Sequence, residues 1–396
     1  MRPARAAALL LAATAMAGAP GRARAQTSGL RWYLLDVAAA ADSSGYGPAA
    51  ATNLARIRLM DSPRVGPVAF DLAYESFVSL TSAHATTSLV GGLGQPVGAE
   101  WLPLQATITS GSAGSWRHRL DRLSAQIGSR RVELTVGRQA ISWATTLFLT
   151  PADPFAPFDP ADPFREYRAG VDAARVRVFP ARFAEVEAAA RVADTPSGRK
   201  VTAAARGYVS FGQAELSAWG GTVAGEPAGA VGATFGVAGA VLRGEAELRR
   251  DQGRSVLRTS VGADRSVELA GHTFYAMVEY QHDGFGAASA AEIPAVAASA
   301  AAARGDLQVL GRDEAAAQAT YQIHPLVSLE LLGLVNLGDG SALLAPAVSW
   351  SATGAVTVRA GVFAGLGASA ASVPTAPRSE YGPSPLSVYA AVSAIY

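Results

Sequence analysis

The sequence predicts an all-β protein, a transmembrane antiparallel β-barrel of about 18 strands that follows a cleaved signal peptide. Segments of about ten residues alternate apolar and polar side chains, and the connections between them are alternately long and short. Both features are typical of outer-membrane barrels. The chain is also 49% apolar and only 16% charged, yet after residue 25 it has no apolar run long enough to predict a membrane-spanning helix.

The first 25 residues are those of an export signal that the mature chain loses. Arg2 and Arg5 give a basic start, an apolar stretch runs from Ala6 to Met16, and Ala23-Arg24-Ala25 is an A-x-A cleavage site. The alternatives are an ordinary buried helix or a membrane anchor. Removal takes away four of the 33 basic residues and none of the 32 acidic ones, so the net charge becomes about −3. A chain with this net charge lacks the excess of basic residues that is typical of nucleic-acid-binding proteins.

Residues 26–396 are expected to form the barrel, in strands bounded by Gly, Pro, Asp or Ser. The strands are predicted at 30–40, 51–61, 66–79, 116–127, 130–139, 171–179, 183–193, 200–211, 213–223, 229–238, 241–250, 255–265, 271–283, 313–323, 326–337, 342–352, 355–365 and 386–396. Sixteen strands are the alternative, because 229–238 is rich in Gly and Ala and the stretch around Trp101 is ambiguous.

The connections give the barrel an orientation. A single-chain bacterial barrel with both termini in the periplasm has an even number of strands, short periplasmic turns and longer extracellular loops. With 18 strands, every long connection follows an odd-numbered strand and is therefore extracellular. The four long loops are predicted at about 80–115, 140–170, 284–312 and 366–385.

The alternation also separates a lipid face from a lumen face. At 51–61, for example, Ile57 and Leu59 oppose Arg56 and Arg58. A charge on the lipid face costs about 2–4 kcal/mol at the midplane, so the charged faces must line the lumen. A soluble β-sandwich with one wet face is the alternative, but so many sequential hairpins would still need a closed edge.

The charged lumen face supplies the candidate channel-lining residues. These charges can filter ions electrostatically, or they can pair across neighbouring strands and hold the wall. Arg177, for instance, should lie near Glu185 or Glu187. The candidates are Arg56, Arg58, Arg131, Glu133, Arg175, Arg177, Glu185, Glu187, Arg191, Arg243 and Glu245.

The loop at 140–170 is the most distinctive segment of the chain. Three Asp-Pro-Phe-like units make it stiff and rich in turns, since Pro restricts φ and Asp accepts local backbone hydrogen bonds. Because the loop is so apolar, it should fold over the mouth of the barrel or into its lumen. It can act as a constriction with aromatic rings for stacking on sugars, or it can simply pack on the barrel and stabilise it. The candidate constriction residues are Trp143, Asp153, Phe155, Phe158, Asp159, Phe164, Arg165, Arg168 and Asp172.

The two ends of this loop carry a recognisable pattern. Gly137-Arg138-Gln139-x-Ile141-x-Trp143 precedes the turns, and Arg168-x-Gly170-Val171-Asp172-Ala173-x-Arg175 follows them. The pattern resembles a loose group of Gram-negative outer-membrane barrels that includes alginate-export-like porins and other porin-like proteins. The resemblance implies an 18-stranded export or diffusion channel with an arginine-lined lumen.

The last strand ends on an aromatic residue. Counting back from Tyr396, the residues Ala394, Val392, Ala390 and Val388 share one face. This resembles the C-terminal signal that the barrel-assembly machinery reads, so Tyr396 is the candidate insertion signal. The expected partners are this machinery, outer-membrane lipids and, for an exporter, a periplasmic export partner. The sequence leaves the oligomeric state open.

Catalytic and metal-binding signals are weak. None of the five histidines forms an HxxxH or HExxH pair, and no cysteine is present to supply thiolate ligands. His282-Asp283 lies at an outer strand end, where a barrel hydrolase would keep its site. We therefore expect no enzyme, no metal and no cofactor.

The expected function is an outer-membrane channel that passes hydrophilic solutes or exports a polysaccharide, because barrels of 16–18 strands leave an aqueous lumen. The first alternative is a structural or surface-interaction barrel whose loops plug the lumen. A hydrolase at the rim is the second. The sequence names neither the solute nor the direction of transport.

Overall fold

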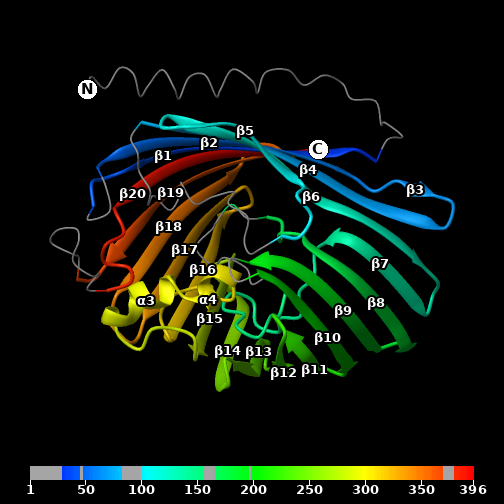
Figure 1. Cartoon of the computed structure of the whole chain (residues 1–396). Helices are drawn as coiled ribbons and strands as arrows, with labels where there is room; N and C mark the ends of the chain where they lie inside the picture. Colours follow the sequence, from blue (N-terminus) through cyan, green and yellow to red (C-terminus); the bar gives the residue numbers. More distant parts are fainter. Residues whose placement is uncertain are drawn as a thin grey trace.

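The computed structural model describes residues 29–44, 48–82, 100–155, 164, 166–195, 198–368 and 379–396. The predicted signal peptide therefore lies outside the described residues. The described part forms one antiparallel β-sheet that closes on itself, because β1 pairs with both β2 and β20 (Figure 1). Closure removes the sheet edges that would otherwise need partners in a membrane.

Eighteen strands make up the closed ring, as the sequence predicted. They are β1 (Arg31–Ala41), β2 (Ala50–Asp61), β4 (Val68–Thr81), β6 (Gly114–Gly128), β7 (Val132–Gln139), β8 (Val171–Ala181), β9 (Ala184–Thr195), β10 (Gly198–Phe211), β11 (Ala214–Val223), β12 (Glu226–Val237), β13 (Ala240–Asp251), β14 (Arg254–Leu269), β15 (His272–Asp283), β16 (Asp313–His324), β17 (Val327–Asn336), β18 (Ala342–Ser351), β19 (Val356–Leu366) and β20 (Ser387–Ile395).

Two short strands stand outside the ring. β3 (Arg64–Val65) pairs with the start of β4 in the turn after β2. Among the described residues, β5 (Gln105–Gly111) pairs only with β6, along the edge that β7 occupies further down. The ambiguous stretch around Trp101 thus leads into a strand that lengthens the wall above β7, and it adds no strand to the ring.

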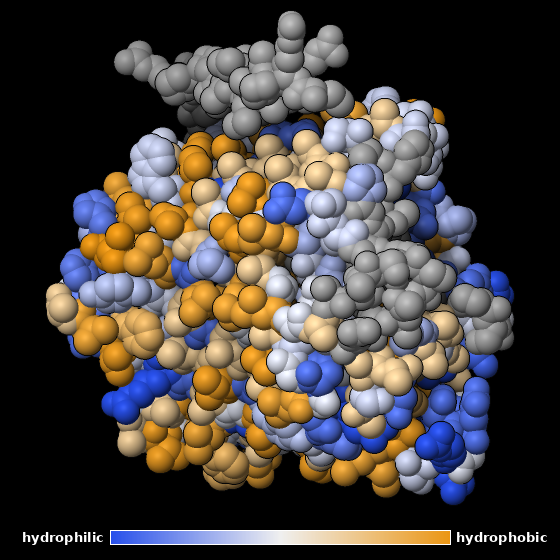
Figure 2. Space-filling model, turned by 90° about the vertical axis from the view of Figure 1, so that its left-hand side faces the viewer, coloured by the Kyte–Doolittle hydropathy of each residue, from blue (hydrophilic) through white to orange (hydrophobic). Residues whose placement is uncertain are grey.

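The side chains alternate between the two faces of the wall as the period-two pattern predicted. On β2, Ile57 and Leu59 are 45% and 38% exposed on the outside, whereas Arg56 and Arg58 are buried on the inside. Apolar residues cover much of the visible exterior in Figure 2. An apolar exterior around a closed barrel is what a membrane-spanning barrel requires.

One irregularity of the wall affects the lumen. Between β4 and β6 the register shifts, so that Ala73 faces Arg122 and Tyr74 faces Leu120. Asp121 is the extra residue of a β-bulge, which re-aims side chains locally. As a result the two adjacent residues Asp121 and Arg122 are both buried and in contact.

The two ends of the barrel differ. One end, here called the loop end, carries the four long connections, and the other, the turn end, carries only short ones. The connection between β15 and β16 contains the 3-10 turn η1 (Ala290–Glu292) and the short helices α3 (Ile293–Ala297) and α4 (Ala300–Arg304). Among the described residues, no helix is long and apolar enough to cross a membrane. In outer-membrane barrels the loop end faces the cell exterior.

The C-terminal residue joins the first strand at the turn end. Tyr396 and Trp32 exchange backbone hydrogen bonds of 2.9 and 3.0 Å, and their rings stack at 6.0 Å. Both side chains face outwards, where aromatic residues form the girdle of a barrel. Whether Tyr396 is an insertion signal stays a prediction.

Candidate transport site in the lumen

The connection between β7 and β8 enters the lumen. We call residues 140–170 the internal loop. The backbone N–H groups of Leu147, Phe148 and Leu149 donate hydrogen bonds of 2.7, 2.9 and 2.7 Å to the carboxylate of Glu279 on β15. A single carboxylate of the wall therefore holds three consecutive peptide groups of the loop, through hydrogen bonds strengthened by its charge.

A second wall carboxylate holds the same part of the loop. Glu245 on β13 accepts hydrogen bonds from the backbone N–H groups of Thr145, Thr146 and Ala152, at 2.6, 3.2 and 3.1 Å. Glu245 and Glu279 are both buried. Their negative charges are thus satisfied by the loop backbone, so neither is left to bind a passing cation.

The predicted stacking aromatics of the internal loop are buried contacts. Trp143 donates a 2.8 Å hydrogen bond from Nε1 to Glu187 of β9. Its ring meets Phe155 edge-on at 4.8 Å and lies 6.2 Å from Trp219 of β11. Trp143 and Phe155 are only 2% and 1% exposed. These rings pack the loop against the β8–β12 wall and leave no face free for a sugar.

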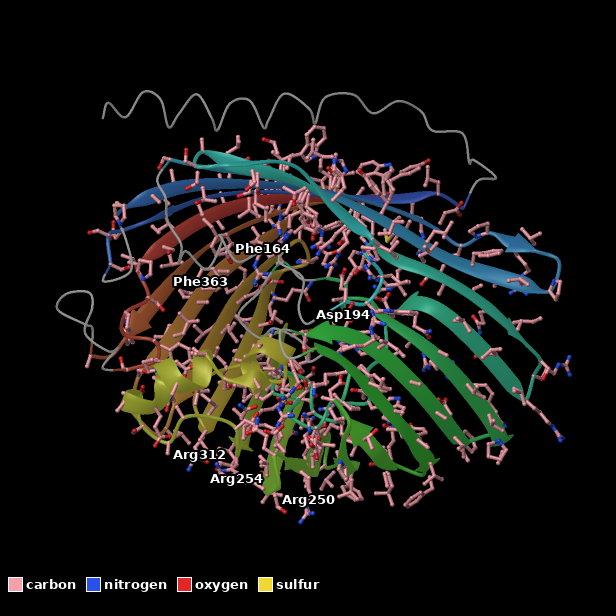
Figure 3. All side chains as sticks on the ribbon, in the orientation of Figure 1. Phe164, Asp194, Arg250, Arg254, Arg312 and Phe363 are labelled. Carbon is pink, nitrogen blue, oxygen red and sulfur yellow. The ribbon has the colours of Figure 1, made fainter. Side chains whose placement is uncertain are left out.

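The far side of the internal loop contacts the opposite wall. Phe164 meets Tyr389 of β20 edge-on at 5.1 Å and belongs to one apolar cluster with Phe363 of β19 and Leu149. Phe164 and Phe363 lie near each other inside the barrel in Figure 3. The loop therefore spans the lumen between two walls and narrows it.

A buried aspartate pins the Asp-Pro turn. Asp153 accepts a 2.7 Å hydrogen bond from Ser142, a 3.0 Å bond from Arg168 and a 3.1 Å bond from the N–H of Phe155. Burial raises the pKa of the Asp153 carboxyl, although Arg168 and the hydrogen bonds oppose that shift. The hydrogen bond between Asp153 and Arg168 thus joins the middle of the internal loop to its end.

The base of the internal loop is closed by an ion pair. Arg138 and Asp172 lie opposite each other on β7 and β8, and the guanidinium donates two hydrogen bonds of 2.8 Å to the carboxylate. Asp172 also accepts the N–H groups of Trp101 and Leu102, at 2.9 and 2.8 Å, while Arg138 lies 3.0 Å from Glu100. The preceding connection is therefore tied to the same pair.

Two glycines of the recognised pattern permit this closure. Gly137 has φ +119°, and a Cβ there would lie 2.2 Å from the backbone oxygen of Leu123. A Cβ on Gly170 would lie 2.2 Å from the backbone oxygen of Asp121, and the N–H of Gly170 donates to the Asp121 carboxylate at 3.1 Å. Only a residue without a side chain fits at these positions.

The arginines of β2 and β6 are paired. Arg58 lies 2.6 Å from Glu75 and 2.7 Å from Asp121, and Arg119 bridges the same two carboxylates at 3.0 and 2.7 Å. The Arg58 guanidinium also lies over the ring of Tyr167 in the internal loop, 4.4 Å from its centroid. This network links the wall to the loop.

Further round the wall the same pairing recurs. Arg175 lies 2.7 Å from Glu187, and Arg177 lies 2.9 Å from Glu185 and 3.1 Å from Glu133. The arrangement supports the interpretation that many predicted lumen charges hold neighbouring strands together.

A small pocket beneath the internal loop contains two arginines and one glutamate, Arg206, Arg243 and Glu215. It has a volume of about 130 Å³ and lies between Thr145 and the inner faces of β10–β13. Arg206 lies over the ring of Tyr208, 5.4 Å from its centroid, and forms no ion pair with any residue that the structure describes. Arg243 contacts Asp264. The polar side chains that line the pocket are Thr145, Arg206, Tyr208, Glu215, Ser217, Thr234 and Arg243.

The connection 284–312 is held over the loop end by charge. Asp306 lies 3.2 Å from Arg249 and 2.8 Å from Arg304, and its backbone oxygen accepts a 2.7 Å hydrogen bond from Arg258. Burial alone would raise the pKa of Asp306, but the three arginines outweigh it and lower the pKa.

Comparisons with known proteins agree on the fold. No protein-family model matches the sequence, and no curated protein matches it. OpdK of Pseudomonas aeruginosa, solved with vanillate, has a TM-score of 0.53 and 11% identity over 93% of this chain and 98% of its own. OccK2 (OpdF) of the same organism gives 0.56 and 12% over 93% and 97%. OccAB1 of Acinetobacter baumannii gives 0.55 and 10% over 93% and 96%.

The chain has the fold of the Occ/Opd outer-membrane porins. The predicted porin-like barrel is thereby confirmed, and the fold fits an outer-membrane location. These neighbours are porins. They give no support to the alginate-export-like resemblance. The pattern that carried that resemblance closes the base of the internal loop.

The remaining predicted residues fall in different places. Phe158, Asp159 and Arg165 lie outside the described residues. Arg131 lies in the exposed turn before β7, since that strand begins at Val132 and not at residue 130.

Two further arginines face the lumen but contact the protein itself. Arg56 lies 3.6 Å from Glu75 and over the rings of Tyr33 and Phe77. Arg191 donates to the backbone oxygen of Phe155. Within the described ranges, no group of three His, Asp or Glu side chains is arranged to hold a metal ion.

Several important residues were absent from the candidate list, among them Glu279, Arg206 and Asp121. Glu279 was on the lumen face of a predicted strand, so the alternation could have found it. Arg206 could have been found in the same way on 200–211. Asp121 could not, because the bulge reverses the face that simple alternation assigns to it.

Proposed function

We propose that the protein is an outer-membrane channel for small hydrophilic solutes, and that its preferred solutes are organic anions. The observation that carries this proposal is Arg206 in the pocket beneath the internal loop, which forms no ion pair with any described residue. Arg206 faces the pocket with a buried Nε–H that has no hydrogen-bond partner among the described residues. A carboxylate is the group that a guanidinium recognises best, through paired hydrogen bonds.

The surroundings of Arg206 suit such a solute. Ser217 and Thr234 add hydroxyl groups, and Tyr208 adds an aromatic ring. Two structural neighbours, OpdK and OccK2, were solved with vanillate and glucuronate, and both molecules are carboxylates. These two neighbours support a carboxylate as the solute of this channel.

The experiment is single-channel recording in planar bilayers, with glucuronate and vanillate added at graded concentrations. We expect anion-selective current that these solutes reduce while they occupy the pore. Replacing Arg206 with Ala should weaken that reduction about tenfold, since a lost charged hydrogen bond is worth about 1.5–3 kcal/mol. The control is Arg177→Ala, which removes a lumen arginine that is already paired. Equal effects of the two variants would contradict the pocket as the solute site.

The plugged barrel stays the second candidate because the internal loop touches two opposite walls. A barrel sealed by this loop would carry no current, and the double variant Glu245→Ala, Glu279→Ala would open it. Export of a polysaccharide would need a continuous path for a chain, and the anchored loop makes that the weaker proposal. Current through the unmodified protein would decide against a sealed barrel.

A further inference from the structure

The outside of the barrel carries a polar pair where only lipid contacts are expected. Asp36 on β1 and Asn53 on β2 both face outwards, between inward residues that are buried. Asn53 donates a 3.2 Å hydrogen bond to Asp36 and a 3.3 Å bond to the backbone oxygen of Val37. The second carboxylate oxygen of Asp36 has no partner among the described residues.

The position of this pair is close to the middle of the membrane. Trp32 and Tyr396 mark the aromatic girdle at the turn end. Asp36 lies four residues along β1 from Trp32. Four residues of a strand tilted by about 40° rise about 10 Å, and the apolar band of a barrel is about 25 Å tall. A carboxylate exposed to hydrocarbon at this depth costs free energy, so a covering partner would stabilise it.

The surroundings of the pair are suited to close approach by another barrel. The strand register sets Asn53 beside Ala38, Ala38 beside Ala390, and Asp36 beside Ala55. An apolar hollow of about 490 Å³ continues from Asn53 over the alanines of β1, β2 and β20 towards the loop end. Figure 1 shows these three strands side by side. Small residues around a polar pair are what permits backbones to pack closely inside a membrane.

We propose that this patch, defined by Asp36, Asn53, Ala38, Ala55 and Ala390, binds a second copy of this chain. The pair is self-complementary about a twofold axis. Each Asn53 amide can keep one hydrogen bond to its own Asp36 and turn its second N–H from the long Val37 contact to the free oxygen of Asp36 in the other copy. Four side chains then close a ring, which satisfies both carboxylates and is the arrangement of an isologous dimer.

The chain has no cysteine, so the interface can be tested with single-cysteine variants. Ala38→Cys lies beside Asn53 at the centre of the patch. Ala218→Cys is the matched control, because it is an outward-facing alanine on β11, across the barrel from β1. Each full-length variant is folded into lipid vesicles, oxidised and analysed by non-reducing electrophoresis. We expect a band of twice the monomer mass for Ala38→Cys and its absence for Ala218→Cys.

A second measurement separates the interface from the folding of the barrel. Added to Ala38→Cys, Asp36→Leu should remove the cross-linked band. As a single substitution, it should reduce the mass of the detergent-solubilised protein, measured by light scattering, from dimer to monomer. Slower migration of the same variant after heating than before heating, in electrophoresis with SDS, shows that its barrel has folded whether or not it carries current. The proposal is overturned if Ala38→Cys gives no more dimer than Ala218→Cys. It is also overturned if the band has the mass of one copy bound to another protein, or if Asp36→Leu leaves the dimer unchanged.

Discussion

Arg138 and Asp172 are joined by two hydrogen bonds of 2.8 Å, one to each carboxylate oxygen. The two residues lie just before and just after the internal loop, and both are buried. The pair therefore closes the loop at its base. Other residues of the loop contact the far wall, among them Phe164, which packs against Tyr389.

Removing one partner of this pair should destabilise the barrel strongly. Arg138→Ala leaves the Asp172 carboxylate buried with backbone donors only, and loss of one partner of a buried pair costs about 3–5 kcal/mol. The measurement is the free energy of unfolding in urea from lipid vesicles. Arg199→Ala is the control, since Arg199 pairs with Asp194 in the solvent and such pairs contribute about 0–1 kcal/mol. Similar losses in the two variants would show that the base of the loop is not closed by this pair.

Glu279 should control how far the internal loop leaves the wall. In Glu279→Gln the three backbone N–H groups lose the charged acceptor, so segment 147–149 should move more freely. We expect larger single-channel conductance and more current noise. Glu330→Gln is the matched control, because it removes one lumen carboxylate that pairs with Arg359 rather than with the loop. If Glu330→Gln changes the current equally, lumen charge rather than loop anchoring sets the conductance.

The strained backbone at the end of β7 gives a test that is independent of charge. Gly137→Ala would force a Cβ against the backbone at a φ that side chains avoid, which costs about 1–3 kcal/mol. Gly207→Ala is the control, because open space surrounds that position and its φ is ordinary. Urea unfolding should separate the two variants. Equal stability would mean that β7 can shift away from Leu123 at no cost.

The sequence predicted the wall well because the wall depends on a local rule. Period-two alternation and turn residues identified all eighteen strands of the ring, and adjacent-strand geometry predicted the proximity of Arg177 and Glu185. The same rule failed at Asp121, where one inserted residue reverses the faces. It also missed β5, which lies inside the connection predicted at 80–115 and whose residues are all exposed rather than alternating.

The contents of the lumen were predictable only in outline. The apolar Asp-Pro-Phe units indicated a loop that folds inwards or over the mouth, and the loop does enter. Its anchors were not predictable, because Glu279 is about 130 residues away from Leu149 in the chain. Contacts at that separation depend on the closed barrel, and strand periodicity carries no information about them.

Asp306 should make the connection 284–312 sensitive to acid. Its pKa in the folded protein is lowered, because Arg249, Arg304 and Arg258 outweigh the effect of burial. The stabilisation is therefore fully present above the ordinary aspartate pKa of about 4 and is lost as the pH falls through the lower folded value. We expect steady current from pH 7 to about pH 5 and increasing noise below pH 4, measured by single-channel recording.

The matching substitution should reproduce the acid effect at neutral pH. Asp306→Asn removes the negative charge that attracts the three arginines. The current of this variant should therefore be noisy already at pH 7, and the noise should change little on acidification. Asp71→Asn is the control, because Asp71 is an exposed lumen acid near the turn end, and its one ion pair among the described residues, with Arg122, is 4.0 Å long. If Asp306→Asn stays quiet at pH 7 while the unmodified channel becomes noisy in acid, another carboxylate is responsible. The ion pairs at Asp306 would then not be what holds this connection over the mouth.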